Sequence, residues 1–219
     1  LTISAVYSSE GLILNYVALF TEITQMKEHQ QQLEYIAHYD VLTNLPNRVL
    51  LAVRLDQAIQ QCHRHQRSLA VVFLDLDGFK DVNDQYGHDI GDQLLITVSQ
   101  RMQNALRTSD TLARIGGDEF VAVLEDLENI EDCEPLLLRL LQAASEPISI
   151  DHAKMHISAS IGVTFYPQDK VDADQLIRHA DQAMYTAKQF GKNRYHMFDT
   201  IQDHALKTLQ KHIESVHTA

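Results

Sequence analysis

Two pairs of acidic residues occupy positions at which metal ions and phosphates can be bound. Asp75 and Asp77 come directly after the apolar run of residues 69–74, and a second pair closes the Gly-Gly-Asp-Glu segment of residues 116–119. Ionised carboxylates at the end of a buried strand are costly unless they are paired or bind a metal, and glycines let a ligand approach the backbone closely. If the two strands are neighbours, Asp75 and the second pair converge on one spot.

The ligand expected at that spot is Mg²⁺. Hard oxygen donors suit this ion, which usually binds one or two carboxylates together with substrate phosphates. Two such ions can hold the attacking and leaving oxygens of a phosphoryl transfer. The alternative is that both pairs are ordinary turn acids. Two other motifs are excluded: the chain has no Walker A loop, and residues 81–92 depart from a calcium loop in the place of the glycine and in ending on Asp92.

The composition is that of an acidic globular chain. Its 219 residues carry a formal net charge of −12, which disfavours a nucleic-acid polymer as partner because such binding calls for clustered Lys and Arg. Two cysteines exclude a disulfide scaffold and indicate a reducing, cytoplasmic location. No apolar run is long enough to span a membrane, so membrane contact is not indicated within this chain. The first residue is not Met, which suggests a piece of a longer protein that could be anchored upstream.

Before residue 40 the sequence predicts a hairpin and a helix. Ile3, Ala5 and Tyr7 alternate with polar residues, and a turn at residues 8–11 precedes a second apolar run. Apolar positions in residues 22–39 follow heptad spacing over about two heptads, which is short for a coiled coil. At the other end of the chain, residues 200–217 predict a polar helix.

Between these flanks, helices and strands are mixed. Residues 69–74 are continuously apolar, as in a central strand covered on both faces, and residues 155–165 alternate, as in a half-buried strand. A hairpin is expected around the two glycines. The other elements expected are helices near residues 49–65, 90–106, 130–144 and 176–187 and a short strand at residues 195–198.

The chain resembles the GGDEF family, the diguanylate cyclases, over about residues 35–198. Residues 114–120, Arg-Ile-Gly-Gly-Asp-Glu-Phe, resemble the motif that names the family. Residues 40–48 resemble its opening motif, residues 75–92 its substrate segment, and residues 184–193 its closing helix and turn. Chance agreement would not place all of these motifs in this order.

This resemblance implies an α+β fold with the palm core of nucleotidyl cyclases, a central and mostly antiparallel five-stranded sheet surrounded by helices. The implied reaction is the condensation of two GTP molecules into cyclic di-GMP with release of two pyrophosphates. Each domain would hold one GTP. Two domains must face each other in a homodimer, so that each ribose 3′-hydroxyl attacks the α-phosphate of the other GTP. The implied cofactor is Mg²⁺, two ions per active site, with Mn²⁺ as a substitute.

The resemblance also assigns the metal site residue by residue. Asp75 and Asp118 would bind the metal ions, assisted by the backbone carbonyl of Leu76. Glu119 would be a further catalytic carboxylate, either as a metal ligand or as an aid to deprotonation of the hydroxyl.

Substrate positions follow in the same way. Asn83 and Asp92 would read guanine, because a carboxylate can accept from its N1–H and N2–H₂ donors and an amide suits its mixed edges. The phosphates and the rest of the substrate would contact Gly78, Phe79 and Lys80 through backbone N–H groups, together with His88, Gly116, Gly117, Lys188 and Lys192. Lys192 stands where the family more often has Arg. The lysine keeps the positive charge but lacks the bidentate fork of the guanidinium group. The resemblance leaves the role of His88 open.

Arg107 and Asp110 stand where the family places an Arg-x-x-Asp inhibitory site for the product, cyclic di-GMP. Arg107 would bind a phosphate or a guanine edge through its fork, and Asp110 the guanine N–H groups. The alternative is an ordinary surface pair.

The flanking segments carry their own resemblances. Residues 1–24 are similar to the last hairpin of a PAS sensor domain, and residues 25–39 to a helical signalling linker. Residues 40–198 would be the GGDEF domain, and residues 199–219 resemble a helical tail or linker to an EAL phosphodiesterase domain. The second hypothesis for function is therefore a catalytically silent module that binds GTP or cyclic di-GMP and tunes such a neighbour. The intact turn at residues 116–119 favours the active cyclase.

Overall fold

The computed structural model describes residues 2–19, 22–150 and 153–199 and divides into two units, residues 1–37 and 38–219. In the first unit, β1 (Thr2–Tyr7) and β2 (Ile13–Leu19) form an antiparallel hairpin, and α1 (Thr24–His38) follows. The hairpin and the helix predicted from the sequence are confirmed. The helix predicted for residues 200–217 lies outside the described residues.

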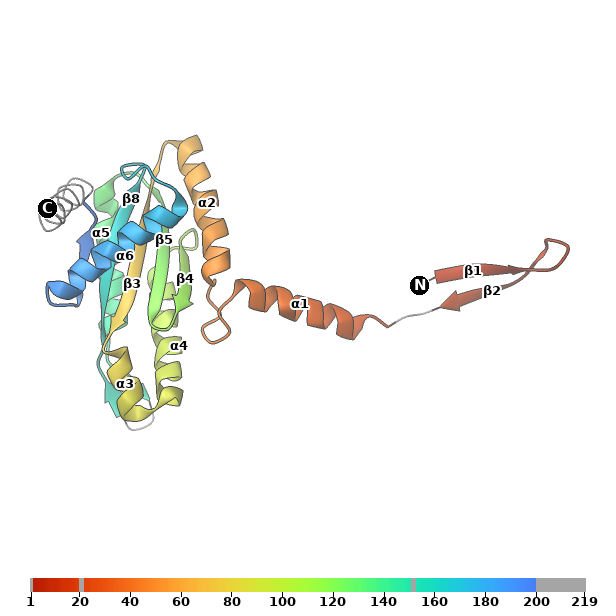
Figure 1. Ribbon diagram of the computed structural model, residues 1–219, viewed down its shortest axis with the longest axis horizontal. Helices are drawn as coiled ribbons and strands as arrows, with labels where there is room; N and C mark the ends of the chain where they lie inside the picture. Colours follow the sequence, from red (N-terminus) through yellow and green to blue (C-terminus); the bar gives the residue numbers. More distant parts are fainter. Residues whose placement is uncertain (1, 20–21, 151–152, 200–219) are drawn as a thin grey trace, which may run out of the picture. The chain divides into compact units, whose positions relative to one another are not determined.

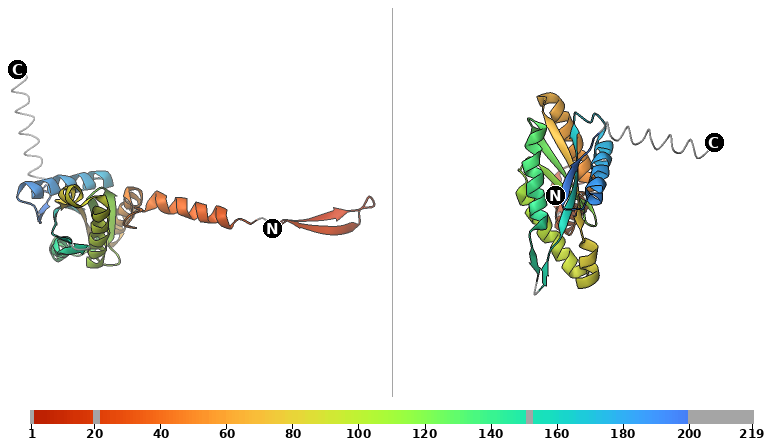
Figure 2. Two further views of the ribbon diagram at one scale, coloured as in Figure 1. Left: turned by 90° about the horizontal axis from the view of Figure 1, so that it is seen from below. Right: turned by 90° about the vertical axis from the view of Figure 1, so that its left-hand side faces the viewer.

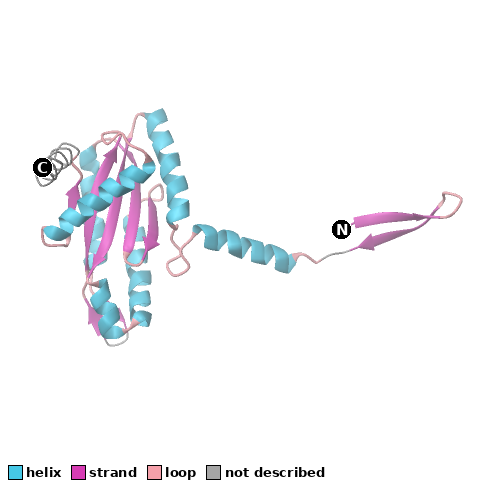
Figure 3. Cartoon of the chain, viewed as in Figure 1, coloured by secondary structure: helices cyan, strands magenta, loops and turns pink. Residues whose placement is uncertain are grey.

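The second unit is built on a five-stranded sheet with the order β4-β5-β3-β8-β9 (Figures 1 and 3). Its strands are β3 (Ser68–Asp77), β4 (Thr111–Gly116), β5 (Glu119–Leu127), β8 (Ser158–Tyr166) and β9 (Arg194–Met197). All neighbours are antiparallel except β8 and β9, which are parallel. This confirms the α+β fold with a mostly antiparallel central sheet.

Alternation along the central strand β3 assigns the two faces of the sheet. Ala70, Val72 and Leu74 pack in one apolar cluster with α4 (His88–Ala105) and α5 (Glu134–Ser145). Val71 and Phe73 pack in a second cluster with α2 (Arg48–His65) and α6 (Ala173–Gln189). Figure 2 shows the blue helix α6 and the green helix α5 on opposite sides of the sheet. Because alternate residues of a strand share a face, Asp75 and Asp77 lie on the side of α2 and α6.

The strand predicted over residues 155–165 is broken into two, which corrects the sequence analysis. Met155 ends β7 (Ala153–Met155), which pairs with β6 (Ile148–Ile150) in a small separate sheet, whereas Ser158 opens β8 opposite Asp77. The apolar alternation continues across the break because Met155, Ile157 and the alternate apolar residues of β8 belong to one apolar cluster. The half-buried strand predicted for this segment is wrong for β8, which is buried on both faces, since its other face packs against α6 at Gly162. Periodicity alone could show neither the break nor the second covered face.

Two helical regions also differ from expectation. The helix expected at residues 130–144 is a 3₁₀ turn, η1 (Ile130–Cys133), followed by α5, which begins next to Pro135, a residue well suited to a helix N-terminus. The segment compared with a calcium loop, residues 81–92, overlaps α3 (Phe79–Tyr86), a helix that was not predicted from the sequence. Both cysteines are free and buried. Among the residues described, no helix is both long and apolar enough to cross a membrane.

Candidate functional site

Asp75 and the acidic pair of residues 118–119 converge at one end of the β3–β5 pair. Asp75 is directly opposite Glu119 in the antiparallel register, so their side chains share a face of the sheet. The backbone N–H of Leu76 donates to the carbonyl oxygen of Asp118 at 3.2 Å and holds the turn against β3. The convergence predicted from the sequence is therefore confirmed, although both Asp75 and Asp77 lie within β3 rather than after it.

Lys188 supplies positive charge to this cluster from α6. Its Nζ atom lies 2.7 Å from Oδ2 of Asp75, a residue only 8% exposed. Burial raises the pKa of Asp75, and the charge of Asp118 adds to that effect, whereas Lys188 opposes it. The carboxylate therefore sits in a place that favours a cation close by.

The pKa of Glu119 is raised by the same group of negative charges. Burial raises its pKa, and Asp75, Asp181 and Asp118 raise it further, while Arg48 acts in the opposite direction. The sequence analysis did not identify Asp181 or Arg48. Asp181 precedes Lys188 by about two turns of α6, so helical periodicity counted back from Lys188 could have found it.

The carboxylate donors at this point fit Mg²⁺. Within the described ranges, no three His, Cys, Asp or Glu side chains are already gathered as a ligand set. Mg²⁺ commonly needs only one or two protein carboxylates, because substrate phosphates and water complete its shell. Asp75 and Glu119, opposite each other and both with raised pKa values, can provide that pair.

Asp77 has a different role from Asp75, although the sequence analysis treated them as a pair. Its Oδ2 accepts from the hydroxyl of Ser158 at 2.7 Å and from the backbone N–H of Asn193 at 3.3 Å, and its Oδ1 accepts from the hydroxyl of Ser160 at 2.8 Å. A buried carboxylate with this set of donors is satisfied without a metal. Asp77 thus fastens the turn that follows α6 to the central sheet.

That turn places Lys192 after the end of α6. The backbone N–H of Lys192 donates to the carbonyl of Ala187 at 3.2 Å, and that of Gly191 to the carbonyl of Lys188 at 3.3 Å. Lys192 and Asn193 both have positive φ, 61° and 47°. These bonds close a tight turn directly after α6, four residues beyond Lys188, and the side chain of Lys192 is exposed there.

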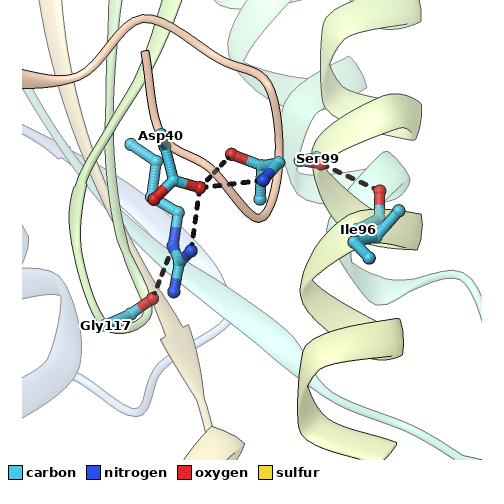
Figure 4. Close-up of polar contacts among 6 residues, drawn as sticks. Asp40, Ile96, Ser99 and Gly117 are labelled. Carbon is cyan, nitrogen blue, oxygen red and sulfur yellow. Dashed lines mark hydrogen bonds and ion pairs between the residues drawn. The ribbon is translucent and has the colours of Figure 1, made fainter. Parts of the chain in front are cut away.

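A second ion pair is hydrogen-bonded to the turn of the two glycines (Figure 4). Arg114 contacts Oδ1 of Asp40 through Nη1 at 2.9 Å and donates from Nε to the carbonyl of Gly117 at 2.9 Å. Burial would raise the pKa of Asp40, but hydrogen bonds from Thr43 and Arg114 outweigh it and hold the pKa below its usual value. Gly117 has a φ of 50°, which a glycine adopts without strain. The opening motif is thus tied directly to the acidic turn.

The predicted guanine positions, and the predicted phosphate contacts of residues 78–80, lie on α3 with its N-cap and on α4. Gly78 is the N-cap of α3, with a φ of 81°, so no side chain of the N-cap residue occupies the first N–H groups of the helix. The buried side chain of Phe79 anchors that end of the helix in the core. Asn83 is half-buried on α3, whereas Asp92 is exposed on α4. Lys80 and His88 are exposed as well, and His88 is the first residue of α4.

Arg107 and Asp110 lie at the opposite end of the β4–β5 hairpin from the acidic turn. Asp110 accepts from the backbone N–H of Arg107 at 2.8 Å and from that of Glu125 at 3.2 Å. Arg107 lines a cavity of about 490 Å³ together with Arg139. The Asp110 carboxylate is therefore used to shape this turn, while the two arginines face a shared space.

A sheet of this order, with an acidic turn between β4 and β5 beside the central strand β3 and a lysine from α6 in contact with it, is the architecture of a nucleotidyl-cyclase palm. The family described as "Diguanylate cyclase, GGDEF domain" matches residues 37–194. The chain belongs to this GGDEF family.

Known relatives span the activities of cyclic di-GMP turnover. MucR of Pseudomonas aeruginosa, a bifunctional diguanylate cyclase/cyclic di-GMP phosphodiesterase, is 47% identical over 177 residues, 81% of this chain and 26% of MucR. NbdA of the same organism, a cyclic di-GMP phosphodiesterase, is 40% identical over 80% of this chain and 22% of NbdA. The chain thus spans about a quarter of the length of these relatives.

One solved structure similar to this chain contains a bound ligand. It is the coiled coil and GGDEF domain of DgcB from Caulobacter crescentus in complex with c-di-GMP. It aligns with a TM-score of 0.71 and 26% identity, over 80% of this chain and 93% of that one.

Proposed function

We propose that this chain is an active diguanylate cyclase, which condenses two GTP molecules into cyclic di-GMP and two pyrophosphates. The observation that carries the proposal is the pairing of Asp75 with Glu119 across β3 and β5, with Lys188 at 2.7 Å from Asp75. Such a cluster gathers negative charge that Mg²⁺ ions shared with a substrate triphosphate would neutralise. Family membership supplies the substrate class.

In each half of the reaction, the 3′-hydroxyl oxygen of one GTP bonds to the α-phosphorus of the other, and the bond from that phosphorus to the bridging oxygen breaks to release pyrophosphate. Mg²⁺, when bound by Asp75, Asp118 and Glu119, supplies charge stabilisation for the phosphates. Glu119 either serves there or takes the hydroxyl proton, for which its raised pKa is suited. Lys188 and Lys192 add positive charge for the phosphates.

Specificity for guanine comes from Asn83 and Asp92. Backbone N–H groups at Gly78 and the start of α3 receive a phosphate, since the first N–H groups of a helix have no intrahelical partner. Each domain holds one GTP, so the reaction needs two copies of the domain. The heptad spacing in α1 is consistent with such pairing, and residues 25–39 are proposed as a signalling linker after a PAS-like hairpin.

A regulatory module is the second candidate, favoured by the similarity to the phosphodiesterase NbdA. In that case the chain would bind GTP or cyclic di-GMP and, without turnover, tune an EAL domain reached through the linker of residues 199–219. Arg107, facing the cavity it shares with Arg139, is proposed as part of a product site in either case, because guanidinium groups bind phosphates in a bidentate manner.

The purified chain is expected to convert GTP with Mg²⁺ into cyclic di-GMP, resolved by chromatography. Its specific activity should rise with protein concentration, because two domains must meet. Glu119→Gln is expected to lower the rate by about a hundredfold or more, the usual contribution of a positioned carboxylate in proton transfer. Arg107→Ala should relieve inhibition by accumulated product.

The opposite result is equally clear. GTP binding without any product over the whole concentration range, also for Arg107→Ala, would support the regulatory module and contradict the cyclase. Equal turnover by Glu119→Gln and the unmodified chain would remove Glu119 from the site.

A further inference from the structure

Gly91 lies in the first turns of α4 against the side chain of Asn83 on α3. A Cβ atom built on Gly91 would stand 1.9 Å from Oδ1, 3.0 Å from Cγ and 3.5 Å from Nδ2 of Asn83. These are its three nearest atoms, and all of them belong to the amide of one side chain. The amide of Asn83 therefore fills the space that any other residue at position 91 would occupy.

The backbone does not require glycine at this position. Gly91 is not among the glycines with positive φ, and a glycine within a helix is less favourable than alanine. Gly91 is also buried, so contact with solvent does not explain the absence of a side chain. The space for the Asn83 amide is the reason that remains.

The chain between the two helices keeps this contact close. The backbone N–H of Gly87 donates to the carbonyl of Asn83 at 2.9 Å, and the N–H of Gly91 donates to the carbonyl of Gly87 at 3.2 Å. Gly87, with a φ of 87°, is both the C-cap of α3 and the N-cap of α4, and the backbone of Gly91 lies directly against the Asn83 amide. The amide of Asn83 is then held in one orientation against Gly91, the residue that immediately precedes Asp92.

We propose that Gly91 is a positioning residue for specificity: because it has no side chain, it leaves the space that holds the Asn83 amide in the orientation that reads guanine. The inference rests on the proposed function, since it takes Asn83 as a guanine contact. An alanine at position 91 displaces the amide by rotation of a flexible side chain, which leaves the fold in place. What changes is the discrimination between guanine and adenine nucleotides.

The test is a double-mutant cycle in nucleotide binding. The full chain and its variants Gly91→Ala, Asn83→Ala and the double variant are titrated calorimetrically with Mg²⁺ and 3′-deoxyGTP, which lacks the attacking hydroxyl and cannot be condensed. The same titrations with 3′-deoxyATP measure discrimination. Asn83→Ala is the matched background because it removes each of the atoms that the new Cβ would meet.

Gly91→Ala is expected to weaken 3′-deoxyGTP binding about tenfold, the scale of one lost polar contact, with little change for 3′-deoxyATP. In the Asn83→Ala background the same substitution is expected to change binding less than about twofold, because contacting residues are not additive. The melting temperature of Gly91→Ala should stay close to that of the unmodified chain.

Three results would overturn the inference. The first is equal 3′-deoxyGTP affinity for Gly91→Ala and the unmodified chain. The second is a tenfold loss that recurs in the Asn83→Ala background, which would place the effect in the helix. The third is a fall in melting temperature that accounts for the loss. If the unmodified chain itself fails to bind 3′-deoxyGTP, the proposed function fails, and this inference with it.

Discussion

Asp75→Asn is expected to reduce the rate of cyclic di-GMP formation by about a thousandfold or more, since loss of a metal-binding carboxylate forfeits several kcal/mol of charge stabilisation. The asparagine keeps the shape of the side chain but removes the charge that Lys188 contacts at 2.7 Å. The rate is measured by chromatography of the products at saturating GTP and Mg²⁺.

The fold of Asp75→Asn should remain intact. Burial and Asp118 raise the pKa of Asp75, and burial and Asp75 raise that of Glu119, so the folded chain holds their protons more tightly than the unfolded chain does. The stability of the metal-free chain should therefore increase as the pH falls through these raised pKa values. Asp75→Asn removes one of these negative charges at neutral pH and should therefore also increase the stability of the metal-free chain.

Asp77→Asn is the matched control, with the same chemical change two positions along β3. One oxygen remains to accept from Ser160 or Ser158, so this variant should melt at a lower temperature yet retain more activity than Asp75→Asn. A thousandfold loss in both variants, or in neither, would contradict the separate roles assigned to the two carboxylates.

Gly162→Ala is expected to cause the largest loss of stability of any single methyl addition in the sheet. A Cβ at this position would stand 1.9 Å from the carbonyl oxygen of Ala180, 2.1 Å from the backbone nitrogen of Met184 and 2.7 Å from the carbonyl carbon of Ala183. These are backbone atoms of α6, which cannot rotate away as a side chain can. The helix as a whole must move off β8.

Overpacking of this kind costs about 3 kcal/mol or more, which lowers the melting temperature by about 6–12 °C in a domain of this size. Activity should fall too, because α6 carries Lys188. Thermal unfolding is compared with that of Gly91→Ala, in which the obstacle is only the end of a side chain. Equal melting temperatures for the two alanine variants would show that α6 does not approach β8 as closely as the structure has it.

Local patterns in the sequence were sufficient for the central part of this architecture. The unbroken apolar run at residues 69–74 predicted a strand covered on both faces, and its alternate residues do pack against two different helix layers. The two glycines at residues 116–117 predicted a hairpin whose acids would meet Asp75 if the strands were neighbours. The pairing of β3 with β5 confirms that condition.

The features that could not be predicted from the sequence depend on contacts between residues far apart in the chain. Asp75 and Asp77 are two residues apart on one strand, and their roles separate through distant partners: the serines of β8 and the N–H of Asn193 satisfy Asp77, whereas Asp75 faces the cation of Lys188. The contact between Arg114 and Asp40 likewise joins two distant motifs. The break between β7 and β8 depends on which strand each half pairs with. None of these long-range pairings produces a signal in the local periodicity or composition of the sequence.

The metal–nucleotide site at Asp75 is tested most directly by binding of Mn²⁺, an ion whose free form gives a sharp electron paramagnetic resonance signal. Mn²⁺ is titrated into the unmodified chain, Asp75→Asn and Asp77→Asn in the presence of 3′-deoxyGTP. Loss of the free-ion signal is expected with the unmodified chain and with Asp77→Asn, and a signal close to that of nucleotide alone with Asp75→Asn. Undiminished binding by Asp75→Asn would contradict the assignment of this carboxylate to the metal.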